Sequence, residues 1–283
     1  MKKQWLLAAG MLVCVDASAF EYEWEGFNLN VNSRLTAGVM VRMEDRSYDL
    51  LGKENVPGQQ FLCAQDTCTS LSGDNSLNQR LVDAAGGFAA VNNDDGDLNY
   101  DTYDPVAAPF RLMSDLKVTR DSWTGRLRAI AFYDPVNVGF DEHHNDTRFQ
   151  PAETPRSKQV ENIYGKGVDL YDAFVQRAFN WKGREGALTV GYQSVRWGES
   201  TLIARNSVAE LNAPDSIRLH TPGADINAVF QPVAAVVLNS ALTDNFSAEL
   251  VYQLEWRKVQ PDPSCSFFAD LDLTQEAANA PDA

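Results

Sequence analysis

Apolar and polar residues alternate over two long segments of this chain. Between residues 27 and 43 every odd position except Ser33 is apolar, and most even positions are polar. Between residues 246 and 256 every even position is apolar and every odd position except Val251 is polar. A period of two residues is typical of a β-strand with one apolar face. Both segments exceed the ~5–6 residues of a common globular strand.

The segment 246–256 has the length of a membrane-crossing strand. Its eleven residues at ~3.3 Å each, tilted by ~45°, cover roughly 24 Å of height. The lipid-facing band of a β-barrel is ~25 Å tall and carries aromatic residues at both rims. Phe246 and Trp256 occupy the positions of those aromatic residues. A strand of a soluble β-sandwich also alternates, but it is shorter and its ends are less regularly aromatic.

Long and short connections alternate between the predicted strands. Weaker alternation adds five strands to the two clear ones, at 110–120, 125–134, 168–181, 187–197 and 233–242. The connections 44–109, 135–167 and 198–232 are long, and 121–124, 182–186 and 243–245 are short. Outer-membrane barrels have long extracellular loops and short periplasmic turns. We therefore predict an all-β fold, an antiparallel outer-membrane β-barrel formed by residues 20–256, with the faces of 168–181 unassigned because Arg177 breaks their pattern.

The first 19 residues have the features of a secretory signal peptide. Lys2 and Lys3 precede a short apolar stretch, and Ala17-Ser18-Ala19 is a suitable cleavage site. The apolar stretch is too short for a membrane-spanning helix, which needs ~20 residues. We expect the mature chain to leave the cytoplasm of a Gram-negative bacterium and to reside in its outer membrane, in contact with lipid and lipopolysaccharide.

The predicted barrel is incomplete. Bacterial barrels usually have an even number of strands, at least eight, and seven are predicted here. Residues 257–283 are acidic and lack a strand pattern, as an unfinished extracellular loop would. We expect this sequence to be the N-terminal part of a larger protein.

Charge and cysteine content restrict the function further. The chain has 39 acidic and 24 basic residues, a formal charge of −15, which argues against nucleic acid as a partner. In an oxidising compartment Cys63 and Cys68 are expected to form a disulfide. Cys265 is then either a free thiol or bonded to a cysteine beyond residue 283.

Two clusters contain metal-binding residue types. Asp95, Asp97, Asn99 and Asp101 share one face if their segment is extended, and their oxygen atoms suit Ca²⁺, but the EF-hand order is absent. A solvated loop or a polar lumen face explains them as well. His143 and His144 lack a third spaced ligand. We expect no metal, no cofactor and no catalytic residues in this part of the chain.

Arg196, Trp197 and Glu199 are the candidate pore residues, at the end of the predicted strand 187–197. Arg196 and Glu199 form a charged pair in the lumen if both point inward, and the segment up to Pro232 then folds inward as a constriction. An aromatic residue at the rim followed by an ordinary turn is the alternative. The even position of Arg196 favours that alternative, because Leu188, at the same parity, is expected to face lipid.

Several segments resemble a known family. They are 94–104 (DDGDLNYDTYD), 110–116 (FRLMSDL), 170–174 (LYDAF), 191–201 (GYQSVRWGEST) and 242–258 (LTDNFSAELVYQLEWRK). They resemble the Gram-negative family catalogued as domain of unknown function 1302, with WGES and YQLEW as the most specific elements. The resemblance implies an outer-membrane β-barrel longer than this chain. It also suggests periplasmic or efflux partners for hydrophobic compounds.

We therefore expect an outer-membrane channel or transporter for small or hydrophobic molecules. One alternative is an outer-membrane enzyme whose catalytic groups lie in the missing half. Another is a soluble secreted β protein, either a binding protein or an adhesin, which would lack a lipid-facing band.

Overall fold

The computed structural model describes most of the chain. It describes residues 9–16, 19–53, 55–59, 62, 82–87, 96–142, 154–156, 158–195, 211–224, 228–263 and 266–269. These residues form one ten-stranded sheet and one two-stranded sheet. All pairs of strands in both sheets are antiparallel, as the ten registers show. The chain therefore has the all-β antiparallel fold predicted from its alternation.

The large sheet contains all seven predicted strands. They are β3 (Phe27–Val41), β5 (Phe110–Arg120), β6 (Trp123–Tyr133), β9 (Lys166–Trp181), β10 (Arg184–Gln193), β11 (Val233–Thr243) and β12 (Phe246–Gln253). Each lies beside the next in this order. The short strands β1 (Ala9–Asp16), β2 (Phe20–Trp24) and β4 (Pro105–Ala107) pair with β3. Within the described residues the sheet is open, with β12 at one edge.

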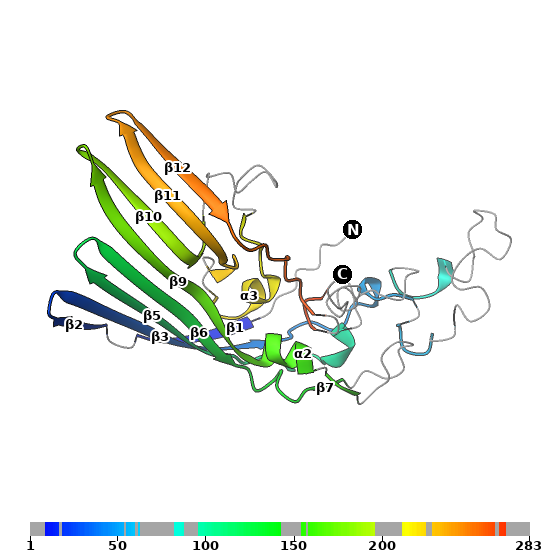
Figure 1. The fold of residues 1–283 in the computed structure, drawn as a ribbon. Coiled ribbons are helices and arrows are strands. Elements are labelled where there is room, and N and C mark those ends of the chain that lie inside the picture. The colour runs from blue at the N-terminus through cyan, green and yellow to red at the C-terminus, as the bar shows by residue number, and fades with distance from the viewer. Residues whose placement is uncertain are drawn as a thin grey trace, which may run out of the picture.

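All the short turns lie at one end of the sheet, and the long connections lie at the other (Figure 1). Glu25, Asp121 and Lys182 each begin a two-residue turn with positive φ angles of 46°, 50° and 54°. Glycine follows two of them, Gly26 at 81° and Gly183 at 80°. Turns with positive φ match the twist of antiparallel strands and make tight hairpins.

In the described parts of the long connections, the elements besides β4 are short. They are η1 (Tyr48–Leu50), η2 (Gly96–Asn99), β7 (Asp141–Glu142), β8 (Thr154–Pro155), α2 (Lys158–Val160), η3 (Glu161–Gly165) and α3 (Ser216–His220). Strands β7 and β8 form the small sheet. Among the described residues, no helix combines the length and apolar character needed to cross a membrane.

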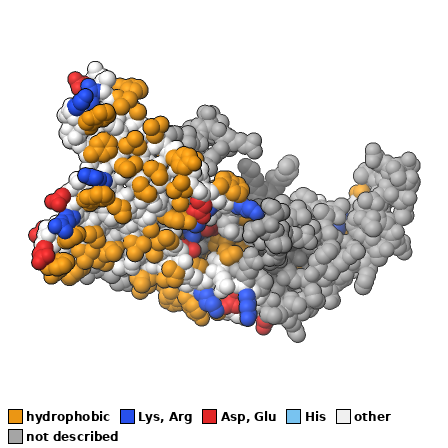
Figure 2. All heavy atoms as spheres, in the orientation of Figure 1, with side chains coloured by type: hydrophobic (Ala, Val, Ile, Leu, Met, Phe, Trp, Pro, Cys, Tyr) orange, Lys and Arg blue, Asp and Glu red, His pale blue; other side chains and the backbone are white. Residues whose placement is uncertain are grey.

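One face of the large sheet is apolar and exposed. Large hydrophobic side chains on it include Leu112, Leu127, Val168, Leu188 and Leu250, which is 67% exposed. Figure 2 shows hydrophobic side chains over most of this part of the molecule, with charged ones mainly toward its margins. An exposed apolar face that extends over several neighbouring strands is uncommon on a monomeric soluble protein.

The opposite face carries ion pairs between neighbouring strands. Arg126 of β6 donates to Asp115 of β5, with 3.0 Å between Nε and Oδ1. Arg128 of β6 pairs with Asp172 of β9, with 3.0 Å between Nε and Oδ2. We call this the inner face, because the sheet curves around it and α3 lies against it (Figure 1). On β11 the same face carries the buried apolar residues Val233, Ala235 and Val237, so the inner face combines charged and apolar parts.

A β-bulge interrupts the alternation of the fourth predicted strand, β9, in addition to the break at Arg177. Arg128 pairs with Asp172, but the next residue, Ala129, pairs with Leu170, so Tyr171 has no opposing residue in β6. The extra residue shifts the alternation of β9 by one position. Both Tyr171 and Asp172 are buried, and Tyr171 packs against Ile130. Beyond the bulge, Arg177 lies on the apolar face, over the ring of Trp123 at 5.1 Å.

Residues 1–19 were expected to lie outside the fold, but part of them forms strand β1. In the uncleaved chain Ala9–Asp16 pairs with β3, from Ala9 opposite Val41 to Asp16 opposite Arg34. Strand β2 covers that edge of β3 only as far as Val31. The remaining edge has free backbone hydrogen-bonding groups, which an apolar segment can pair with.

Candidate functional site

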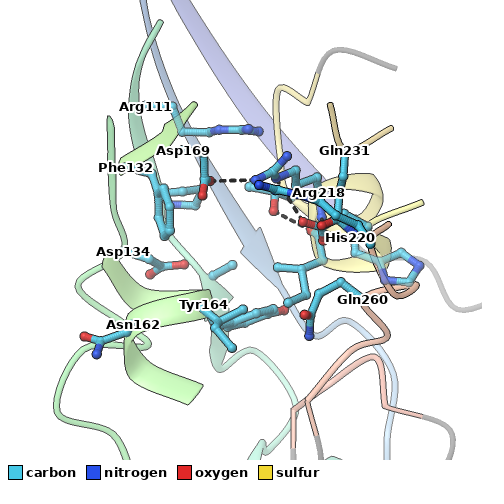
Figure 3. Close-up of a pocket in the computed structure, with 17 residues that line it drawn as sticks. Arg111, Phe132, Asp134, Asn162, Tyr164, Asp169, Arg218, His220, Gln231 and Gln260 are labelled. Carbon is cyan, nitrogen blue, oxygen red and sulfur yellow. Dashed lines mark hydrogen bonds and ion pairs between the residues drawn. The ribbon is translucent and has the colours of Figure 1, made fainter. Parts of the chain in front are cut away.

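A cavity of ≈ 210 Å³ lies at the end of the inner face away from the short turns. Its walls come from β5, from the end of β6, from η3, from the start of β9 and from α3 (Figure 3). The segment predicted to fold inward after the fifth strand thus contributes one wall through α3. The cavity combines charged groups with apolar side chains, as small-molecule sites generally do.

Helix α3 is set by Asp215, which precedes its first residue. The Oδ1 atom of Asp215 accepts a hydrogen bond from the backbone N–H of Arg218 at 3.4 Å. Aspartate is a favoured residue at this position because its carboxylate satisfies an unpaired backbone donor. Burial raises the pKa of Asp215, and the Arg218 guanidinium lowers it in part. Burial has the larger of these two effects on the pKa.

Arg218 connects α3 to the sheet. Its Nη2 lies 3.0 Å from Oδ2 of Asp169 on β9, and its Nε lies 3.0 Å from Oδ2 of Asp215. Its guanidinium also lies over the Tyr171 ring, 4.7 Å from the centroid. The Tyr171 hydroxyl donates to the backbone oxygen of Ala228 at 3.1 Å. Tyr171, the extra residue of the bulge in β9, therefore contacts both α3 and the chain that follows it.

Asp134 supports the opposite wall, directly after β6. Its Oδ1 accepts backbone N–H groups from Ala108 at 3.0 Å and Val136 at 2.9 Å. Its Oδ2 accepts from the Asn137 side chain at 3.0 Å. Burial raises the pKa of Asp134, and these donors oppose that rise. Through these hydrogen bonds the carboxylate fixes the chain directly after β6.

Arg111 is the unusual group of the cavity. It belongs to β5 and is only 8% exposed. Its Nη1 atom is buried and has no hydrogen-bond partner among the described residues. In Figure 3 the side chain extends across the cavity beside Arg218, and no dashed line reaches it. Leaving a buried charged group without a partner is costly, so Arg111 is the strongest indication of a ligand.

A histidine–aspartate pair lies at the margin of the cavity. Nδ1 of His220 is 3.1 Å from Oδ2 of Asp262, and its ring stacks on Phe268 with 4.4 Å between centroids. The described lining residues include Thr221 but no serine or cysteine. The pair orders the loop after β12 against α3.

The acidic cluster predicted from the sequence has a structural role in its described part. Gly96–Asn99 is a 3₁₀ turn rather than an extended segment, so alternate side chains do not share one face. Asp97 is buried and pairs with Arg42 at 2.9 Å, whereas Asp101 pairs with Arg46 at 2.6 Å. Asn99 is also buried. No group of three metal-binding side chains occurs among the described residues.

The remaining predicted site residues lie outside the described part of the chain. They are Asp95, Cys63, Cys68, Arg196, Trp197 and Glu199, together with His143, His144 and Cys265. The Cys63–Cys68 disulfide stays a prediction, as does the charged pair Arg196–Glu199. Strand β10 ends at Gln193. The alternation of the strand therefore does not extend to Arg196, and its even position does not predict which way its side chain faces.

The sequence patterns do not mark Arg111, Asp169 and Arg218 as site residues. Arg111 and Asp169 lie on the inner faces of predicted strands, where charged residues are ordinary. Arg218 lies in a connection without a recognisable pattern. No sequence signal distinguishes Arg111 from Arg126, because only the packing of α3 makes one of them buried and unpaired.

The fold and the cavity together define an all-β protein with an exposed apolar face and a charged inner face. The family described as Protein of unknown function (DUF1302) matches residues 1–281. The chain belongs to this family, as its resemblance in five segments indicated. No curated protein matches the chain, and no solved structure matches it.

Proposed function

We propose that this protein is an outer-membrane β-barrel that acts as a channel or transporter for small molecules. One observation carries the proposal: the long strands expose apolar side chains on one face and place ion pairs on the other. Barrel strands in a membrane alternate between lipid-facing apolar and lumen-facing polar residues. The alternation of long and short connections at opposite ends of the sheet supports the same reading (Figure 1).

The proposal has a structural requirement. Lipid offers no hydrogen bonds to an open sheet edge. Strand β12 and the edge of β3 must therefore be covered by further strands, so that the sheet closes around the inner face. Removal of residues 1–19 as a signal peptide would free the edge of β3 from Arg34 to Val41, where β1 pairs with it.

The test is the location of the protein followed by its conductance. Cells expressing it are fractionated, and the outer-membrane protein is extracted in detergent and reconstituted into planar bilayers. We expect recovery with the outer membrane and stepwise conductance that depends on the added protein. Recovery as a soluble periplasmic protein would contradict the location, and bilayers that stay silent would contradict the pore.

A further inference from the structure

Among the described residues, each arginine that lines the cavity is in an ion pair except Arg111. Arg218 pairs with both Asp169 and Asp215. Asp134 is satisfied by three N–H donors. Arg257, which also lines the cavity, pairs with Glu255 at 3.2 Å. None of the ion pairs between described residues includes Arg111, and its buried Nη1 atom has no hydrogen-bond partner among them.

The position of Arg111 is fixed by the sheet. Its backbone pairs with Thr36 of β3 and with Phe132 of β6. With strands on both sides, its side chain can only project from the inner face into the cavity (Figure 3). A guanidinium held in one place presents a planar pair of N–H donors, which matches the two oxygens of a carboxylate. The geometry therefore favours an anion with a planar head.

Apolar side chains form part of the remaining wall, among polar and charged ones. They include Ala107, Pro109, Phe132, Ile163 and Ile217. An engineered apolar cavity of about 150 Å³ is large enough to bind benzene, and the cavity here measures ≈ 210 Å³. A benzene-sized body with one carboxylate is therefore compatible with both its volume and its walls.

We propose that this cavity binds small aromatic or branched aliphatic monocarboxylates, with the carboxylate on Arg111 and the apolar body against Phe132 and Ile217. The inference rests on the proposed function, since it names the class of solute that the inner face takes up. An anion here gives the buried Nη1 atom of Arg111 the hydrogen-bond partner that no described residue supplies.

Binding is measured with 4-fluorobenzoate on the full chain in detergent, by fluorine NMR and by the shift in thermal midpoint. The neutral probe 4-fluorobenzyl alcohol has the same body without the charge, and inorganic phosphate has charge without the body. The variant is Arg111→Gln. The control is Lys117→Gln, which removes a positive charge from the same face of the same strand, at an exposed position.

The wild type is expected to bind 4-fluorobenzoate at least about tenfold more tightly than either other probe, the discrimination expected of a paired buried charge. Arg111→Gln should lose that preference, whereas Lys117→Gln should keep it within about twofold. Without ligand, the thermal midpoint of Arg111→Gln should equal or exceed that of the wild type, because the variant removes an unpaired buried charge. A ligand that binds only the folded state raises the midpoint, so 4-fluorobenzoate should raise that of the wild type alone.

Three results would overturn the inference. They are equal binding of the acid and the alcohol, binding of phosphate in preference to 4-fluorobenzoate, and unchanged binding by Arg111→Gln. Conductance of the same preparation separates this failure from failure of the proposed function. Pores without carboxylate binding would refute only the inference, and carboxylate binding without pores would refute the proposed function.

Discussion

Arg218 of α3 and Asp169 of β9 form an ion pair, with 3.0 Å between Nη2 and Oδ2. This contact joins α3, which lies in the long connection after β10, to the inner face of β9. Asp215 holds the same guanidinium from the other side. The cavity exists because of this connection, and Arg111 is buried by it.

The first prediction concerns the two ends of the sheet. In the outer membrane, the long connection 44–109 should be extracellular and the turn after β5 periplasmic. Trypsin added to intact cells should cut after Arg46, Lys53 or Arg80 and should spare Arg120. Cells with a permeabilised outer membrane are the control, since Arg120 should then become accessible. Cleavage at Arg120 in intact cells would contradict the orientation.

Leu250 and Glu249 test which face of β12 contacts lipid. Leu250 is 67% exposed on the apolar face, and Glu249 is its neighbour on the inner face. Arginine on the lipid side near mid-membrane costs ~2–4 kcal/mol. Leu250→Arg should therefore impair assembly strongly and Glu249→Arg should not. The readout is heat-modifiable gel mobility, and equal effects of the two variants would refute the assignment of faces.

Two ion pairs in the first long connection should differ in their contribution to stability. Arg42 and Asp97 are both buried, and Arg42 also donates to the backbone oxygens of Asp97 and Glu44. Removing one partner of a buried pair costs ~3–5 kcal/mol, whereas an exposed pair contributes up to ~1 kcal/mol. Asp97→Asn should thus lower the free energy of unfolding far more than Asp101→Asn, which loosens the exposed pair with Arg46. Similar thermal midpoints for the two variants would contradict this difference.

The pH dependence of stability should include a contribution from Asp215. Its pKa in the folded protein is raised by burial above an unfolded value of about 3.9. The folded state therefore binds the proton more tightly, and stability from this group increases as pH falls from the raised pKa toward the unfolded value. Asp215→Asn keeps an acceptor for the Arg218 N–H but cannot titrate. In acid, the thermal midpoint of the wild type should rise relative to that of Asp215→Asn, and parallel pH profiles would exclude the contribution.

The predicted constriction can be tested by ion selectivity. If Arg196 and Glu199 face the pore, removing one partner leaves an unbalanced charge close to permeating ions. Arg196→Ala should shift the reversal potential toward cation selectivity and Glu199→Ala toward anion selectivity. Lys117→Gln, on the inner face of β5, reports the effect of a charge change elsewhere in the lumen. Unchanged reversal potentials in both pore variants would remove the pair from the pathway.

The sequence by itself determined the strands and the outward faces of β10 and β12. All seven predicted strands are present, and Leu188 and Leu250 face outward as their parity required. Alternation is a local property, because successive side chains of an extended chain point to opposite sides whatever lies beside them. The short turns followed from the same pattern, since each joins two adjacent strands.

Only the tertiary structure decided what fills the inner face. The bulge at Tyr171 arises where β9 pairs with β6, so the sequence of β9 alone could not place Asp169 and Asp172. Helix α3 has five residues and no periodic pattern, and its position depends on contacts with Asp169 and Tyr171. That packing determines that Arg111 is buried and that its Nη1 atom has no partner among the described residues. A guanidinium on a strand is exposed or buried, paired or unpaired, according to what distant segments bring against it, and those contacts exist only in the folded chain.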